Sequence, residues 1–121
     1  MTKLLIADDD SLFRSGLVRR LKRLNIDLEE VSNVKDLIRK ARTQKYNILI
    51  TDYDMGKNPE EKGTYAIKEI RKFDIITPIV FHSSFVSTQL LGEALSLGAN
   101  YVLGKNETDA LIRIVNQQKS L

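Results

Sequence analysis

Side chains able to do metal or phosphoryl chemistry follow four short apolar segments of this 121-residue chain. Asp8 and Asp9 come directly after residues 3–7, and Asp52 after 46–51. Ser83 and Lys105 come after two further apolar segments. The intervals between these sites correspond to one or two strand–helix units, one of them with a lengthened loop. If the apolar segments are parallel strands, all four sites lie at the carboxyl edge of one sheet, where open α/β folds bind ligands.

Three carboxylates at this edge require positive charge nearby. At an effective dielectric constant near 20, two such charges in close contact repel by about 4 kcal/mol. Lys105 supplies one positive charge, and a hard divalent cation suits the oxygen ligands of Asp8, Asp9 and Asp52. Few protein ligands and several waters favour magnesium over calcium. A carboxylate beside Mg²⁺, a lysine and a hydroxyl can attack a phosphoryl group and carry it as an acyl phosphate.

The elements that must position these residues alternate between strand and helix five times. Apolar periodicity and turn residues predict strands at 3–7, 26–31, 46–51, 79–82 and 101–103. Helices are predicted at 11–24, 34–41, 64–73, from after 84 to 97, and 107–118, with 52–63 as a polar loop. Such alternation predicts an α/β fold with a parallel sheet and helices on both faces.

Composition narrows the classes of function. The chain has no cysteine, which excludes disulfides, thiolate catalysis and cysteine-based zinc sites. No apolar run is long enough to span a bilayer, and the N-terminus lacks a secretory signal, so a cytoplasmic location is expected. The net charge is +3. The cations concentrated at 14–23 suit a solvated helix face, and no base-reading motif accompanies them, so no nucleic acid partner is expected.

Five segments resemble the receiver domain of two-component response regulators, specifically the stand-alone chemotaxis type. They are LLIADDD at 4–10, ILITDYDM at 48–55, Gly63, TPIVFHSS at 77–84 and GANYVLGK at 98–105. The resemblance implies a flavodoxin-like receiver fold, with a doubly wound five-stranded parallel sheet of order 2-1-3-4-5 and five flanking helices. It also implies a single receiver domain over residues 1–121.

The resemblance also assigns roles to individual residues. Asp52 would accept a phosphoryl group from a histidine kinase or a histidine phosphotransfer protein, and Ser83 and Lys105 would contact that group. The implied Mg²⁺ ligands are Asp8, Asp9, Asp52 and the backbone carbonyl of Asp54. The phosphorylated surface of the fourth helix, fifth strand and fifth helix would meet a downstream protein. Such a switch is not a conventional enzyme, although it catalyses its own Mg²⁺-dependent phosphorylation and dephosphorylation.

Several residues depart from the receiver pattern. Gly56 replaces the usual proline, residues 57–62 form a longer loop, and Asn106 follows the lysine. Val102 stands where the family has its switch aromatic, and Tyr101 lies one place earlier. A shift of one residue moves a side chain to the other face of a strand, unless a bulge re-aims it.

Alternative readings of the same residues remain open. The chain could be a pseudo-receiver that binds partners without phosphorylation, or the receiver portion of a longer DNA-binding regulator. Asp54 also has the spacing of the second aspartate in haloacid-dehalogenase-type phosphatases, although the chain is short for one. Asp10 or Ser11 is expected to cap a helix. His82 is expected to be a satisfied core or boundary histidine that points away from the face Ser83 serves.

Overall fold

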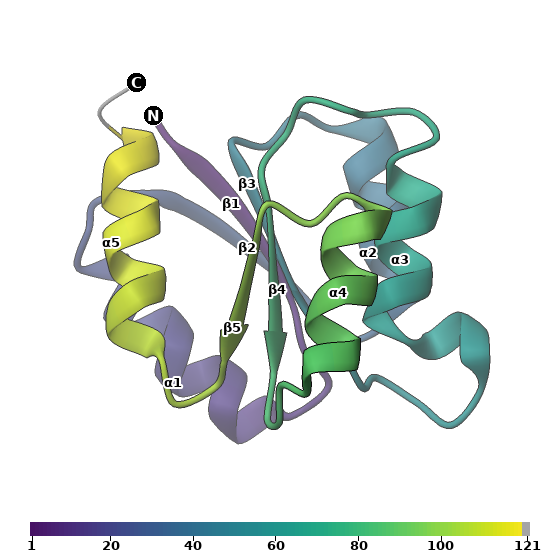
Figure 1. The fold of residues 1–121 in the computed structure, drawn as a ribbon. Helices are drawn as coiled ribbons and strands as arrows, with labels where there is room; N and C mark the ends of the chain where they lie inside the picture. The colour runs from purple at the N-terminus through teal and green to yellow at the C-terminus, as the bar shows by residue number, and fades with distance from the viewer. Residues whose placement is uncertain (120–121) are drawn as a thin grey trace.

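A computed structural model describes residues 1–119, which form one parallel sheet covered by helices on both faces (Figure 1). The strands are β1 (Lys3–Ala7), β2 (Asp27–Val31), β3 (Ile48–Asp52), β4 (Ile79–Ser83) and β5 (Tyr101–Gly104). The helices are α1 (Ser11–Lys22), α2 (Val34–Thr43), α3 (Gly63–Ile70), α4 (Thr88–Leu97) and α5 (Thr108–Lys119), with a short 3-10 helix η1 at Pro59–Glu61.

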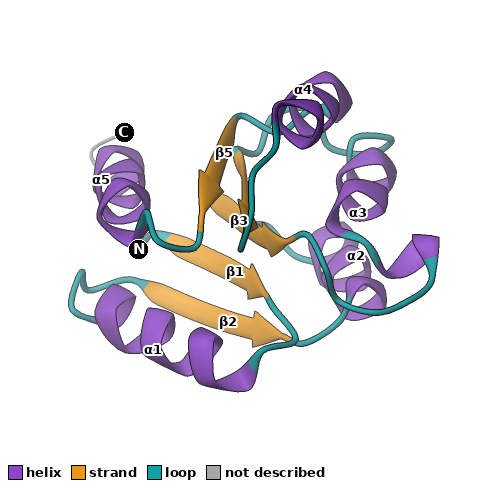
Figure 2. Cartoon of the chain, turned by 60° about the horizontal axis from the view of Figure 1, so that its bottom comes forward, coloured by secondary structure: helices purple, strands orange, loops and turns teal. Residues whose placement is uncertain are grey.

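The sheet has the strand order β2-β1-β3-β4-β5, and all four pairings are parallel. This confirms the predicted fold class and order. Figure 2 shows α1 and α5 on one face of the sheet and α2, α3 and α4 on the other. Because β1 and β3 lie in the middle, with β4 beside them, the four strand ends that carry the polar residues are neighbours.

Each face of the sheet has its own apolar core, as the alternation of strand side chains requires. Along β1, Leu4 and Ile6 pack in the core beneath α1 and α5. Leu5 and Ala7 pack in the core beneath α2, α3 and α4. All four side chains are buried, so β1 is covered on both faces and its end at Asp8 is held in place from both sides.

The residues that cap α1 and α2 and the residue that ends α4 are among those that the sequence predicted. The Asp10 carboxylate accepts a hydrogen bond from the Phe13 backbone N–H at 3.1 Å, as expected for the cap of α1. Asn33 caps α2 by accepting from the Asp36 N–H at 2.8 Å. Gly98 ends α4 with φ of 119°, a left-handed conformation that suits glycine.

Two expectations about residues 52–73 were wrong in detail. The polar stretch 52–63 is not loop throughout, because Pro59–Glu61 forms η1 and Asp54 pairs with Lys62 in an antiparallel bridge. Helix α3 ends at Ile70 rather than Phe73. The Asp74 carboxylate accepts hydrogen bonds from the Ile76 and Thr77 N–H groups, which favours a turn over a further helical turn. Within residues 1–119, no helix is both long and apolar enough to cross a membrane.

Candidate functional site

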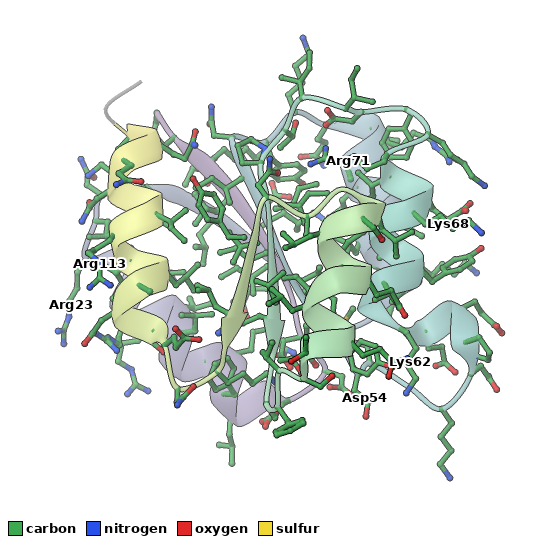
Figure 3. The ribbon with its side chains drawn as sticks, in the orientation of Figure 1. Arg23, Asp54, Lys62, Lys68, Arg71 and Arg113 are labelled. Atoms are coloured by element: carbon green, nitrogen blue, oxygen red, sulfur yellow. The ribbon has the colours of Figure 1, made fainter. Side chains whose placement is uncertain are left out.

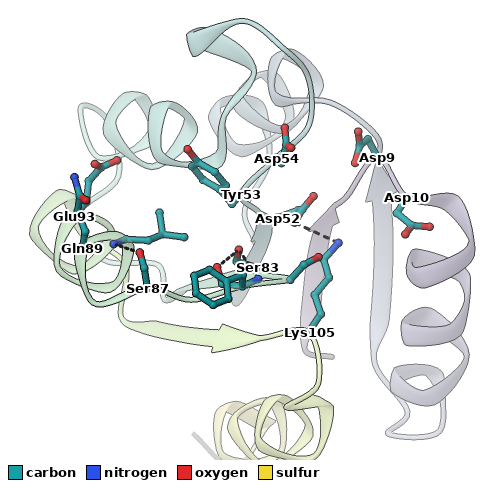
Figure 4. Close-up of a pocket in the computed structure, with 13 residues that line it drawn as sticks. Asp9, Asp10, Asp52, Tyr53, Asp54, Ser83, Ser87, Gln89, Glu93 and Lys105 are labelled. Atoms are coloured by element: carbon teal, nitrogen blue, oxygen red, sulfur yellow. Dashed lines mark hydrogen bonds and ion pairs between the residues drawn. The ribbon is translucent and has the colours of Figure 1, made fainter.

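The ends of β1, β3, β4 and β5 surround an acidic cleft of about 700 Å³. Figure 4 shows Asp9, Asp52 and Lys105 around one side of this cleft and Ser83 beside them. One carboxylate oxygen from each of Asp8, Asp9 and Asp52 lies within 4.8 Å of the other two. The structure therefore brings together the residues that the sequence placed at one sheet edge.

Lys105 is the cation that holds this cluster together. Its Nζ lies 2.9 Å from Oδ2 of Asp8 and 3.3 Å from Oδ1 of Asp52. Burial alone would lower the pKa of Lys105, but the hydrogen bond that Lys105 donates to Asp8 and the charges of both aspartates outweigh burial and raise it. Lys105 therefore stays protonated and bridges the two buried carboxylates.

The three carboxylates are not fully neutralised by this one lysine. Burial, followed by the charge of Asp8, raises the pKa of Asp52, although Lys105 opposes the rise. Burial also raises the pKa of Asp9, with added repulsion from Asp8 and Asp54. The site thus has a surplus of negative charge on closely spaced oxygen atoms, and this donor set fits a hard divalent cation.

Ser83 lies at the end of β4 and lines the same cleft, but its hydroxyl is engaged locally. Oγ donates to the Phe85 carbonyl at 2.9 Å and accepts from the Phe85 N–H at 3.4 Å. The backbone N–H of Lys105 donates to the Ser83 carbonyl at 2.8 Å, which fixes β5 and the lysine beside β4. Ser83 is thus adjacent to the acidic cluster, and its hydroxyl faces Phe85 instead of Asp52.

Asp54 differs from the other acids because its exposed carboxylate is paired with Lys62, a residue that the sequence analysis missed. Oδ1 of Asp54 lies 2.8 Å from Nζ of Lys62, and Figure 3 shows the two side by side. The hydrogen bond from Lys62 lowers the pKa of Asp54. The only signal in the sequence was the lengthened loop 57–62, which gave no indication that its last lysine returns to the site.

Comparison with known proteins decides which family this geometry represents. The family model of the response regulator receiver domain matches residues 4–116. The chain belongs to this family.

Individual relatives show how far the likeness extends. This receiver domain is 30% identical over 102 residues to the sensor protein EvgS of Escherichia coli K12, covering 84% of this chain and 8% of EvgS. It is 26% identical over 104 residues to the transcriptional regulatory protein CrdR of Helicobacter pylori, covering 85% of this chain and 47% of CrdR. The chain therefore spans less than half the length of either relative.

A solved structure resembles the receiver domain over nearly its whole length. It is that of the Francisella response regulator 1452 receiver domain, with a TM-score of 0.87 and 28% sequence identity. The match covers 98% of this chain and 96% of that chain. The likeness therefore extends over the full strand–helix alternation that carries the acidic cleft.

In this receiver domain the position of the usual switch aromatic holds an aliphatic side chain. Val102 packs with the core on the α2, α3 and α4 face, whereas Tyr101 packs with the core beneath α1 and α5. The pairing of β4 with β5 runs without interruption from Val80 with Tyr101 to Ser83 with Gly104. No bulge re-aims Tyr101 within this described ladder, so Tyr101 does not replace the missing aromatic.

His82 is buried beneath the receiver site, and its expected environment was partly wrong. It is 1% exposed and packs on the Phe13 ring, with the ring centroids 5.3 Å apart. Within residues 1–119, however, its Nε2 has no hydrogen-bond partner, so this histidine is not fully satisfied. Burial, then the charge of Lys105, lowers the pKa of His82 to about 4, which keeps the ring neutral. Lys105 Nζ lies 4.6 Å from the centroid of the same Phe13 ring, so Phe13 contacts both residues.

Proposed function

We propose that this receiver domain is a phosphorylation-activated switch whose acceptor is Asp52. The observation that carries the proposal is the placement of Asp52 at the end of β3, buried and 3.3 Å from Lys105 Nζ. An Asp52 carboxylate oxygen would attack the phosphorus of a phosphohistidine, and the bond from phosphorus to the imidazole nitrogen would break. The imidazole leaves on the donor, and Asp52 carries an acyl phosphate. The donor class is a histidine kinase or a histidine phosphotransfer protein.

Lys105 and Ser83 have complementary roles in this proposal. The Lys105 ammonium, already beside Asp52, would pair with an oxygen of the transferred group, a charge-assisted interaction. The Ser83 hydroxyl now donates to the Phe85 carbonyl at 2.9 Å. To donate to a phosphoryl oxygen it must release that carbonyl, so phosphorylation would free the backbone that leads into α4.

The residues at the cleft also fit the Mg²⁺ expected in a receiver domain. Asp8, Asp9 and Asp52 supply closely spaced carboxylate oxygens, and the backbone carbonyl of Asp54 is the fourth proposed protein ligand. When bound, Mg²⁺ would supply positive charge to the carboxylates and to the transferring phosphoryl oxygens. This chain's own contribution is to orient the acceptor carboxylate beside Lys105, whose charge favours the ionised form against the opposing effects of burial and Asp8.

The output surface in this proposal is formed by α4, β5 and α5. Leu91 and Leu95 are exposed large apolar side chains on α4, where a downstream protein could bury them. Because Val102 and Tyr101 do not provide the usual switch aromatic, we assign the change at this surface to the segment from Ser83 to α4. We take residues 1–121 as one receiver domain that acts in the cytoplasm without direct contact to nucleic acid.

The first test is intact-mass spectrometry after incubation with acetyl phosphate and Mg²⁺. We expect a gain of one phosphoryl group in the wild-type protein and none in Asp52→Asn or in samples treated with EDTA. Asp54→Asn is the matched control, because it removes a neighbouring carboxylate but keeps the acceptor, and it should still be modified. Absence of any adduct and of beryllofluoride binding in the wild-type protein would instead favour a pseudo-receiver, the reading that Val102 keeps open.

A further inference from the structure

A second groove, of about 440 Å³, lies between α2 and the segment that begins α3. It shares no lining residue with the acidic cleft. Figures 1 and 2 both show α2 and α3 side by side on one face of the sheet. Val34 and Ile38 of α2 and Tyr65 of α3 supply its apolar lining. The volume lies within the range of roughly 300–1,000 Å³ typical of binding pockets.

A row of three cations borders this apolar lining. Lys35, Arg39 and Arg42 all line the groove, and their spacing on α2 places them along one side of the helix. At 1.5 Å of rise per residue the row extends over about 10 Å. The opposite wall contributes one acid, Glu60. The groove therefore combines an apolar floor with a positively charged edge.

Contacts within the protein leave most of this positive charge available. Lys35 makes no ion pair within residues 1–119. Arg39 lies 3.5 Å from the Asp36 carboxylate in a solvent-exposed pair, and such pairs contribute little to stability. Arg42 stacks on the Phe73 ring at 5.0 Å, which orients the guanidinium without neutralising it. The three cations are thus held along one side of the groove, and most of their charge is not neutralised by contacts within the described residues.

We propose that this groove binds an acidic amphipathic helix of a partner protein. An apolar face with residues at i, i+3 or i+4, and i+7 would cover Val34, Ile38 and Tyr65. Acidic residues flanking that face would pair with Lys35, Arg39 and Arg42. The charge complementarity fixes the direction in which the partner helix lies along α2.

Two features favour this occupant over other polyanions and over a second copy. A nucleic acid backbone would pair with the cations but would leave the apolar lining uncovered. The chain itself offers no matching helix, because each of its five helices carries at most one acidic residue. The partner is therefore a different protein, and its binding does not require phosphorylation of Asp52.

The test measures binding of a fluorescein-labelled synthetic peptide of about 18 residues, with leucines on one helical face and glutamates flanking it. Fluorescence anisotropy should show saturable binding to the wild-type protein and equally to Asp52→Asn. The double variant Arg39→Glu/Arg42→Glu should weaken binding at least tenfold. Its matched control is Arg19→Glu/Lys22→Glu, which makes the same charge change at the same spacing on α1 and should alter the Kd less than twofold.

Four further measurements decide the outcome. Ile38→Asp should also weaken binding at least tenfold, and circular dichroism melts will show that each variant is folded. The proposal is overturned if the acidic peptide does not bind at millimolar concentration, or if a peptide with lysine in place of glutamate binds as well. It is also overturned if the α1 control loses as much affinity as the groove variant. Preferential binding of a short DNA duplex, lost in the same groove variants, would assign the groove to nucleic acid instead.

Discussion

Asp52→Asn is expected to stabilise the metal-free protein at about pH 8, because it removes a buried negative charge that faces Asp8. Burial and the Asp8 charge raise the pKa of Asp52 from its usual 3.8 to about 7, despite the opposing effect of Lys105. A rise of that size corresponds to about 4 kcal/mol, at about 1.4 kcal/mol for each pH unit. Rearrangement of the site will reduce this amount, so we expect a gain of about 2–4 kcal/mol in the free energy of unfolding.

The stabilising effect of Asp52→Asn should increase with pH. Folded Asp52 keeps its proton at pH values where the unfolded chain has lost it. The contribution of Asp52 to the stability of the wild-type protein is therefore complete below a pH of about 4 and is lost as the pH rises through about 7. Asparagine does not titrate, so the advantage of Asp52→Asn should be small at about pH 5 and complete at about pH 8.

Urea unfolding in EDTA, followed by far-UV circular dichroism, measures this difference. The chain has no tryptophan, so a fluorescence signal from that residue is not an option. Asp54→Asn is the control, because its carboxylate is exposed and paired with Lys62, and its removal should give no comparable gain. An equal gain for Asp52→Asn at both pH values, or a loss at about pH 8, would refute the electrostatic account of the site.

Three other substitutions test separate parts of the structure. Gly63→Ala should lower the free energy of unfolding by about 1–3 kcal/mol in urea, because the added Cβ would lie 2.1 Å from the Asp52 carbonyl oxygen. An unchanged free energy of unfolding would show that the backbone there moves freely. Asn25 has φ of 58°, so in the same assay Asn25→Ala should cost about 1 kcal/mol and Asn25→Gly almost nothing; equal costs for the two would contradict the backbone explanation. Phe13→Leu should weaken beryllofluoride binding about two- to fivefold, through loss of the contact that orients Lys105, as measured by titration with Mg²⁺ present; unchanged affinity would remove Phe13 from that role.

The sequence predicted the sheet and the acidic cluster because both depend on short-range, repeated signals. Apolar segments that end in polar residues recur along the chain, and parallel strands must bring such ends to one edge. Asp8, Asp52 and Lys105 are therefore in contact, although they are far apart along the chain. The family resemblance rested on the same segments, so it agreed with the physical argument.

Features that depend on one side chain's orientation could not be predicted in the same way. Nothing in the pattern indicated that Lys62 pairs with Asp54, because that contact requires the loop to fold back on itself. The sequence assigned Ser83 a contact with the phosphoryl group, but it could not show that the hydroxyl donates to the Phe85 carbonyl in the unmodified protein. The lack of a hydrogen-bond partner for Nε2 of His82 within residues 1–119 also depends on tertiary packing, because α1 places Phe13 against the histidine ring.

The loop between β3 and α3 is closed at its base by hydrogen bonds, so the position of the acceptor Asp52 does not depend on the length of the loop. The Gly63 N–H donates to the Tyr53 carbonyl at 2.6 Å, and the Met55 N–H donates to the Glu61 carbonyl at 3.2 Å. These two hydrogen bonds hold the two ends of the loop together. Residues inserted at the tip of the loop should therefore lengthen it without displacing β3. A short reporter peptide inserted between Lys57 and Asn58 should therefore leave acyl phosphate formation at Asp52 intact. The same two hydrogen bonds would let related chains differ in the length and sequence of this loop, so the loop could distinguish one receiver from another.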